Sequence, residues 1–211
     1  MHSDFWHERW NSNRINFHAS EANHLLRAHH DKLNLAEGAR VFLPLCGKTL
    51  DIAWLLSRGF SVVGAELVRI AIEQLFDELK VEPEIRRVGK LEHFSAPNID
   101  MFVGDVFELT QARLGTVDAV YDRAALVALP SETRERYTRH LTHITNNAPQ
   151  LLITFDYDQD VMSGPPFSIS TEAVHGYYGK THKPTLLESV DVPGGLKGQA
   201  AAKENAWLLA R

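Results

Sequence analysis

One stretch decides the fold: residues 40–66 read RVFLPLCGKTLDIAWLLSRGFSVVGAE. After the first arginine, residues 40–45 are continuously apolar, which predicts a buried strand. Apolar side chains then recur at helical spacing over residues 49–56. Gly59 ends that helix, and residues 61–66 form a second apolar strand. The stretch is therefore a strand–helix–strand unit of the kind that builds parallel sheets.

The same alternation continues downstream. The patterns predict, in chain order, a helix over 70–79, strands over 99–103 and 117–121, a helix over 131–146 capped by Ser131, a strand over 151–155, and strands over 186–192 and 206–210 joined at Gly194-Gly195. The last two strands are expected to form a hairpin. The predicted fold class is α/β, with a doubly wound, mostly parallel sheet and an antiparallel C-terminal hairpin.

Length and composition fit one domain. The chain has 211 residues, of which 44% are hydrophobic and 23% charged, enough apolar material for a sizeable core. We expect residues 40–211 to form the sheet core. Residues 1–39 are rich in aromatic residues and histidine, and we expect them to form an N-terminal helical cover. Ligands of such sheets lie beyond the carboxyl ends of the strands, at the topological switch point.

Several classes of partner are disfavoured by the composition. The net charge of -5 is opposite to the basic excess typical of nucleic-acid-binding proteins. A single cysteine cannot form an internal disulfide, which fits a reducing compartment. The sequence shows neither a secretory leader nor an apolar run long enough to span a membrane. We therefore expect a cytoplasmic monomer that acts on a small molecule.

The loop after the first strand is the first candidate for chemistry. Gly47-Lys48-Thr49 is typical of the end of a phosphate-binding loop, but that motif also needs a glycine where the chain has Phe42. The dinucleotide fingerprint fails as well, because no two glycines are separated by a single residue. Glu66 comes at the end of the next strand, where a carboxylate can accept both hydroxyls of a ribose. These features suggest a nucleoside ligand without a phosphate anchor, and they also fit a solvated carboxylate.

Other reactive side chains have plain structural explanations. The histidines lack the spacing of a metal site, and His7-Glu8 does not continue into a zinc-protease motif because position 11 is Asn11. Cys46 stands at the head of a helix, where a nucleophile is conceivable, but a small buried residue in a tight turn is the better interpretation. Asp122-Arg123 follows a strand at the ligand edge and, taken alone, fits a salt bridge at the rim.

Taken together, four stretches closely resemble thiopurine S-methyltransferases. They are VFLPLCGKT at 41–49 followed by SVVGAE at 61–66, YDRAALVAL at 121–129, GPPF at 164–167, and the N-terminal Trp6 and Trp10 with Phe17-His18. The resemblance extends over nearly the whole chain, and the short N-terminus is similar to that of the bacterial branch. It implies a class I methyltransferase (Rossmann-like) fold, with S-adenosyl-L-methionine as methyl donor and S-adenosyl-L-homocysteine as product.

The resemblance also assigns roles to individual residues. Leu45 would contact the methionine end of the donor through its backbone, and Glu66 would hold the ribose hydroxyls. Val106 would line the adenine pocket, and Trp10 would lie over the donor as part of a lid. Arg123 would lie near the transferred methyl group and the acceptor, and it is the one residue assigned to catalysis.

The expected activity is methyl transfer to the sulfur of thiopurines or other aromatic or heterocyclic thiols. The displacement is in line and depends on alignment and desolvation, and no metal is expected. Two alternatives stay open at this point: methylation of inorganic selenium or tellurium species, and a non-catalytic nucleoside sensor. The segment 167–170 reads FSIS, which is more polar than the acceptor cover typical of the family, so the acceptor preference is open.

Overall fold

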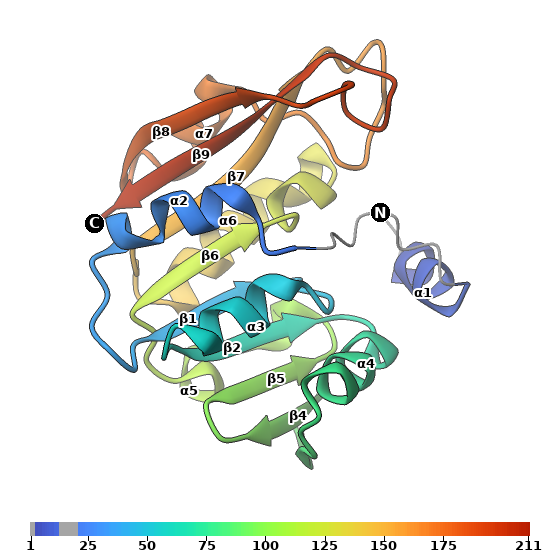
Figure 1. Cartoon of the computed structure of the whole chain (residues 1–211), viewed down its shortest axis with the longest axis vertical. Coiled ribbons are helices and arrows are strands. Elements are labelled where there is room, and N and C mark those ends of the chain that lie inside the picture. Colours follow the sequence, from blue (N-terminus) through green and yellow to red (C-terminus); the bar gives the residue numbers. More distant parts are fainter. Residues whose placement is uncertain (1–2, 13–20) are drawn as a thin grey trace.

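A computed structural model of the chain describes residues 3–12 and 21–211. In this part of the chain a single sheet of nine strands runs through the molecule, with helices against both faces (Figure 1). The strands are β1 (Arg40–Pro44), β2 (Ser61–Glu66), β3 (Glu84–Val88), β4 (Leu91–Ala96), β5 (Ile99–Val103), β6 (Ala119–Arg123), β7 (Gln150–Tyr157), β8 (Lys183–Asp191) and β9 (Ala202–Ala210).

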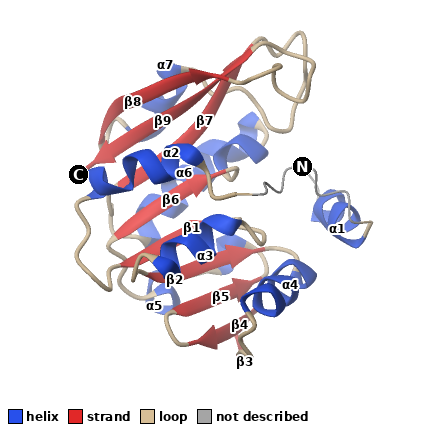
Figure 2. Cartoon of the chain, in the orientation of Figure 1, coloured by secondary structure: helices blue, strands red, loops and turns tan. Residues whose placement is uncertain are grey.

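The helices are more numerous than the sequence patterns predicted. The α-helices are α1 (Ser3–Asn11), α2 (His24–His29), α3 (Leu50–Ser57), α4 (Arg69–Leu79), α5 (Gln111–Leu114), α6 (Ser131–Ile144) and α7 (Thr171–Tyr178). Short 3-10 helices are η1 (His30–Leu33), η2 (Val106–Glu108) and η3 (Leu126–Ala128). Figure 2 shows how they cover the sheet.

The strand order is β3-β4-β5-β2-β1-β6-β7-β9-β8. The five central strands, β5 to β7, are parallel to one another, and an antiparallel pair flanks them at each edge. The chain builds outward from β1 through β2 to β5 and then returns to place β6 against the other side of β1. The switch point is therefore between β1 and β6. The predicted doubly wound sheet and its C-terminal hairpin are confirmed.

The alternation of side chains along β1 shows why its sequence is apolar throughout. Phe42 points to the face covered by α5, α6 and α7, whereas Val41 and Leu43 point to the face covered by α2, α3 and α4. All three side chains are almost fully buried. A strand that is covered on both faces cannot alternate apolar with polar residues.

Four details differ from the sequence-based expectations. Strand β6 runs over Ala119–Arg123 rather than 117–121, so Asp122 and Arg123 end the strand instead of following it. The hairpin of β3 and β4, which pairs antiparallel with β5, was not predicted, because β3 is an exposed and charged edge strand. Helix α7 was missed too. Ser131 is the first residue of α6 rather than its cap, since the cap position is Pro130 and no side chain caps that end.

The N-terminal extension divides into two parts. Helix α2 packs Leu25 and Leu26 into the same core as α3. Helix α1 lies apart from it, beyond the carboxyl ends of the parallel strands and beside α4 (Figure 1). Within residues 3–12 and 21–211, no helix combines the length and the apolar character needed to cross a membrane.

Candidate active site

The loop between β1 and α3 lies at the switch point and shapes the site. Leu45 has a φ of 47° and Gly47 a φ of 54°, so both adopt the left-handed region, which is unusual for leucine. The N–H of Cys46 donates to the carbonyl of Ala65 on β2 at 3.1 Å. Thr49 then caps α3 by accepting from the N–H of Asp51. The loop therefore turns tightly across the ends of β1 and β2.

Glu66 ends β2 and is the carboxylate that holds this loop. Its Oε2 accepts the N–H of Gly47 at 2.8 Å, and its Oε1 accepts the N–H of Val68 at 2.9 Å. The residue is only 6% exposed, and burial raises its pKa while these backbone hydrogen bonds oppose the rise. Each oxygen keeps a further lone pair for a ligand hydroxyl. Glu66 is thus a buried and bonded carboxylate, not the solvated group of the alternative interpretation.

Trp10 of α1 reaches the same loop. It is 4% exposed and packs with Val68 and Ala71 at the start of α4, and Trp6 lies partly buried against this cluster. A β-carbon added to Gly47 would lie 3.0 Å from Cζ2 of Trp10. The close approach and the positive φ together explain why position 47 is glycine.

Val106 follows β5, the strand next to β2. The chain leaves the strand at Gly104, whose N–H donates to the carbonyl of Glu66 at 2.8 Å. Asp105 caps the following turn by accepting the N–H of Phe107, and Val106 itself is 6% exposed. An apolar side chain is therefore held at the carboxyl edge of the sheet, one strand away from Glu66.

Arg123 is the last residue of β6, on the other side of the switch point. Its Nη1 donates to Oγ1 of Thr49 at 3.5 Å and lies 3.6 Å from Oδ2 of Asp51. The side chain is 22% exposed, whereas that of Asp51 is buried. The guanidinium is thus anchored at one end and open to solvent in part. This is more than the rim salt bridge that the sequence alone suggested.

Asp122 points to the opposite face of the sheet from Arg123. Its Oδ2 accepts the hydroxyl of Tyr137 at 2.8 Å, and its Oδ1 accepts the N–H of Leu126 at 3.1 Å. Burial raises its pKa to about 6, against the effect of these hydrogen bonds. Asp122 therefore lies in the core beneath α6, and its neighbours do not place it as a base for an acceptor.

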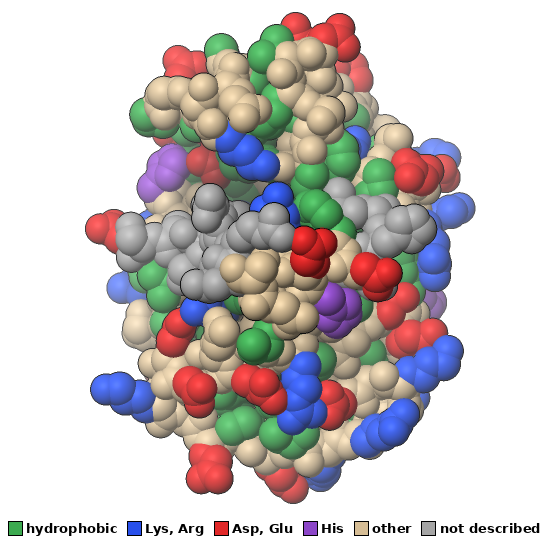
Figure 3. All heavy atoms as spheres, turned by 90° about the vertical axis from the view of Figure 1, so that its right-hand side faces the viewer, with side chains coloured by type: hydrophobic (Ala, Val, Ile, Leu, Met, Phe, Trp, Pro, Cys, Tyr) green, Lys and Arg blue, Asp and Glu red, His purple; other side chains and the backbone are tan. Residues whose placement is uncertain are grey.

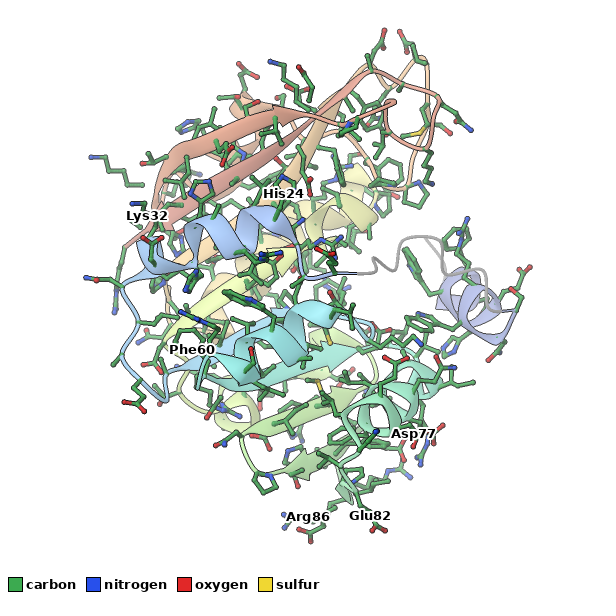
Figure 4. All side chains as sticks on the ribbon, viewed as in Figure 1. His24, Lys32, Phe60, Asp77, Glu82 and Arg86 are labelled. Atoms are coloured by element: carbon green, nitrogen blue, oxygen red, sulfur yellow. The ribbon has the colours of Figure 1, made fainter. Side chains whose placement is uncertain are left out.

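The described cysteine and histidine side chains are not assembled into reactive sites. Cys46 is buried with its Sγ 4.0 Å from Sδ of Met101, and burial raises the pKa of its thiol well above the usual value. The thiolate needed by a nucleophile is therefore suppressed. Among residues 3–12 and 21–211, no three histidine, cysteine or acidic side chains come close enough to hold a metal ion. His24, one of the histidines that belong to no such group, lies at the start of α2, away from α1 (Figure 4).

The structure joins most of the predicted site residues through one loop. Trp10, Glu66 and Arg123 each contact residues 45–49, to which Leu45 belongs, and Val106 follows the neighbouring strand. Figure 3 shows this edge of the molecule. Two other predicted stretches meet as well, because the N–H of Phe167 donates to the carbonyl of Val127 at 2.6 Å. Phe17 and His18, named in the sequence analysis, lie outside the described residues, as does Arg14.

Sequence reasoning missed Asp51 and Tyr121. The hydroxyl of Tyr121 donates to Oδ2 of Asp51 at 3.1 Å, so both belong to the surroundings of Arg123. In the sequence, Asp51 is an ordinary acid in the first turn of a helix and Tyr121 an ordinary strand residue. The one signal was the spacing of two between Tyr121 and Arg123, which puts both side chains on the same face of a strand.

Solved structures of other proteins identify the class of fold. A 1,6-didemethyltoxoflavin-N1-methyltransferase from Burkholderia thailandensis, solved with its substrate and S-adenosylhomocysteine, superposes with a TM-score of 0.66 at 16% identity, covering 99% of this chain and 87% of that one. A TehB-like methyltransferase from Corynebacterium glutamicum gives 0.58 at 12% identity, covering 100% and 98%. The fold is therefore that of the class I S-adenosylmethionine-dependent methyltransferases.

Sequence relatives narrow the class to a family. The model of the thiopurine S-methyltransferase family matches residues 1–211. A thiopurine S-methyltransferase from Xanthobacter autotrophicus is 54% identical over 100% of both chains. Another from Teredinibacter turnerae is 48% identical over 100% of this chain and 98% of its own. The chain belongs to the thiopurine S-methyltransferase family, and S-adenosylmethionine is its methyl donor.

Proposed function

We propose that this methyltransferase transfers the methyl group to the sulfur of thiopurines or of other aromatic or heterocyclic thiols. The observation that carries the proposal is the single loop, residues 45–49, that Glu66, Trp10 and Arg123 all contact. One loop thereby connects the side chains suited to a nucleoside with a cation suited to an anionic acceptor. The similarity to relatives named thiopurine S-methyltransferase supports the choice of acceptor.

Four of the residues suit the donor. Glu66 offers buried carboxylate lone pairs to a ribose diol, and Val106 offers an apolar wall to the adenine. The turned backbone at Leu45 suits the amino-acid end, and the indole of Trp10 attracts a cationic sulfonium through its ring face. When bound, S-adenosylmethionine supplies an electrophilic methyl group. The chain's task is then to align the acceptor and to exclude water.

Arg123 is the proposed catalytic residue on the acceptor side. A thiol reacts as its thiolate, and a guanidinium nearby favours the anionic form of the acceptor. The same cation stacks against a flat ring without losing its charge. No general base is assigned, because a heterocyclic thiol loses its proton readily and Asp122 faces the core.

Helix α1 is the proposed cover of the donor site. It holds Trp10 against the loop at Gly47. The pKa of Lys197, in the connection between β8 and β9, is lowered mainly by burial and further by the positive charge of Arg9, so α1 also lies near that connection. Of the segment 167–170, Ser168 accepts the N–H of Tyr157 and Ser170 caps α7, so their polarity serves the fold. Of the expected division into a cover over 1–39 and a core over 40–211, the proposal keeps α1 as the cover, because α2 packs into the core. A monomer at work in the cytoplasm on a small-molecule thiol is also part of the proposal.

Turnover of donor with a panel of acceptors tests the proposal. The purified chain is expected to produce S-adenosylhomocysteine with 6-mercaptopurine and with a simple aromatic thiol, and faster than with selenite or tellurite. Faster turnover of the inorganic species would favour metalloid methylation instead. Tight binding of S-adenosylmethionine without turnover of any acceptor would favour a sensor.

A further inference from the structure

Asp51 is a fully buried carboxylate that joins three segments of the chain. It lies in the first turn of α3, and its Oδ1 accepts the N–H of Asn23 at 2.7 Å. Its Oδ2 accepts the hydroxyl of Tyr121 at 3.1 Å and lies 3.6 Å from Nη1 of Arg123. Asn23 in turn caps α2 through its own side chain. One side chain therefore connects the start of α2, the start of α3 and the end of β6.

The two carboxylate oxygens of Asp51 have different partners. Oδ1 accepts the backbone N–H of Asn23, whereas Oδ2 contacts both the hydroxyl of Tyr121 and the guanidinium of Arg123. A buried ionised carboxylate is costly unless it is paired and fully hydrogen-bonded. Asp51 also raises the pKa of Tyr121, after the larger effect of burial, so the phenol stays neutral and remains a donor. Arg123 is thus the cation that balances the buried charge.

The surroundings of Arg123 leave it dependent on this contact. Among the described residues, its polar partners are the neutral hydroxyl of Thr49 at 3.5 Å and the carboxylate of Asp51 at 3.6 Å, and Asp51 is the one of opposite charge. A guanidinium has five N–H donors in a fixed plane, so holding Nη1 sets the direction of the others. With Nη1 held, the exposed part of the side chain has one preferred orientation.

From this geometry we infer that Asp51 is a positioning residue for acceptor binding: it holds Arg123 in the orientation that meets the acceptor. The inference rests on the proposed function, in which Arg123 contacts the acceptor. Asp51 itself touches neither substrate. Its loss should therefore weaken acceptor binding far more than donor binding.

Asp51→Asn is the direct test, in the full chain. An amide can accept a hydrogen bond at one of the two oxygen positions, but its NH₂ repels the donors at the other. We expect the KM for 6-mercaptopurine to rise about tenfold, with kcat changed less and the Kd for S-adenosylhomocysteine within about twofold, since one charge-assisted contact is lost. Asp100→Asn is the matched control, because Asp100 pairs with Arg40 near the amino end of the sheet. It should leave the acceptor KM unchanged.

A double variant separates positioning from general destabilisation. If Asp51 acts through Arg123, Asp51→Asn combined with Arg123→Ala should have the same acceptor KM as Arg123→Ala alone. A merely structural role would lower activity further in the double variant. Additive effects, or an unchanged KM in Asp51→Asn, would overturn the inference while the unsubstituted chain still turns over thiols. Absence of thiol turnover in the unsubstituted chain would overturn the proposed function and this inference with it.

If Asp51→Asn fails to fold, the unsubstituted protein decides the matter. A held guanidinium rotates slowly about its Nε–Cζ bond, so NMR should show separate Nη resonances for Arg123, assigned by their loss in Arg123→Lys. A single averaged resonance would mean that Asp51 does not hold the group, and the inference would fail.

Discussion

Two buried carboxylates lie at the carboxyl ends of β2 and β6, the two strands that flank β1, and they have different roles. Glu66 at the end of β2 and Asp122 near the end of β6 are both less than a tenth exposed, both accept backbone N–H groups, and both have raised pKa values caused by burial. Glu66 holds the loop at the switch point, whereas Asp122 is held by Tyr137 in the core beneath α6. The comparison teaches that the face on which an acid lies, rather than its place at a strand end, decides its use.

The largest expected effect is loss of donor binding in Glu66→Ala. Hydrogen bonds to a charged group contribute about 1.5 to 3 kcal/mol each, so loss of the two proposed ribose contacts should cost about 3 to 6 kcal/mol. Titration calorimetry with S-adenosylhomocysteine measures this directly. Asp122→Asn is the matched control, and it should bind the ligand with nearly unchanged affinity.

Glu66→Ala also frees the amides of Gly47 and Val68, so the loop itself can shift. Glu66→Gln retains an acceptor for one of them and should lose less affinity than the alanine variant. Unchanged affinity in Glu66→Ala would break the comparison, because Glu66 would then serve the fold alone, as Asp122 does.

The second prediction concerns stability and pH at Asp122. Its pKa rises from 3.8 to about 6 on folding, so at intermediate pH the folded protein keeps a proton that the unfolded chain has released. The stability that this group contributes is present below pH 4 and is lost as the pH rises through 6, by about 3 kcal/mol in total. Urea unfolding at several pH values, with Asp122→Asn subtracted, should show this decline.

Tyr137→Phe sharpens the same measurement. The Tyr137 hydroxyl donates to Asp122 and lowers its pKa, so its removal should move the decline to higher pH. A difference between parent and Asp122→Asn that rises with pH would show that Asp122 is ionised and well paired at neutral pH.

Some elements of the fold and of the site were predictable from the sequence, and others were not. The unit from β1 to β2 was predictable because strands buried on both faces are apolar throughout and Gly59 marks the turn. The β3 strand was not, because its charged residues are stable only as an exposed edge paired with β4. The placement of Glu66 at the end of β2 was predictable from the apolar strand that precedes it. The contacts of Asp51 were not, because they involve Asn23 and Arg123, which are distant in sequence.

The third prediction compares two tryptophans on α1. Trp10 contacts the loop beside Glu66, whereas Trp6 lies at the edge of the same cluster. Trp10→Ala should weaken binding of S-adenosylmethionine by about 0.5 to 2 kcal/mol, the range of a cation–π contact, and Trp6→Ala by less. Equal effects of the two substitutions would mean that both residues only pack α1 onto α4.

Proteolysis tests whether α1 covers a bound ligand. Cleavage by trypsin near Arg9 should slow when S-adenosylhomocysteine is added, because a cover is held closed by its ligand. The sequence places a second expected cut at Arg14. Equal rates with and without ligand would contradict the proposed cover.

The smallest expected effect is that of a chelator, which should leave the rate unchanged. A metal would be a third role for carboxylates at these strand ends, but the remaining lone pairs of Glu66 are proposed to accept the ribose hydroxyls, and Asp122 lies in the core with both oxygens hydrogen-bonded. In the part of the chain that the structure describes, no further ligands gather beside them, and a sulfonium needs no Lewis acid to lose its methyl group. Donor turnover measured before and after exhaustive treatment with EDTA checks this. If activity is lost and then restored by zinc or magnesium, one of the two carboxylates has a ligand role, and single substitutions of each would show which.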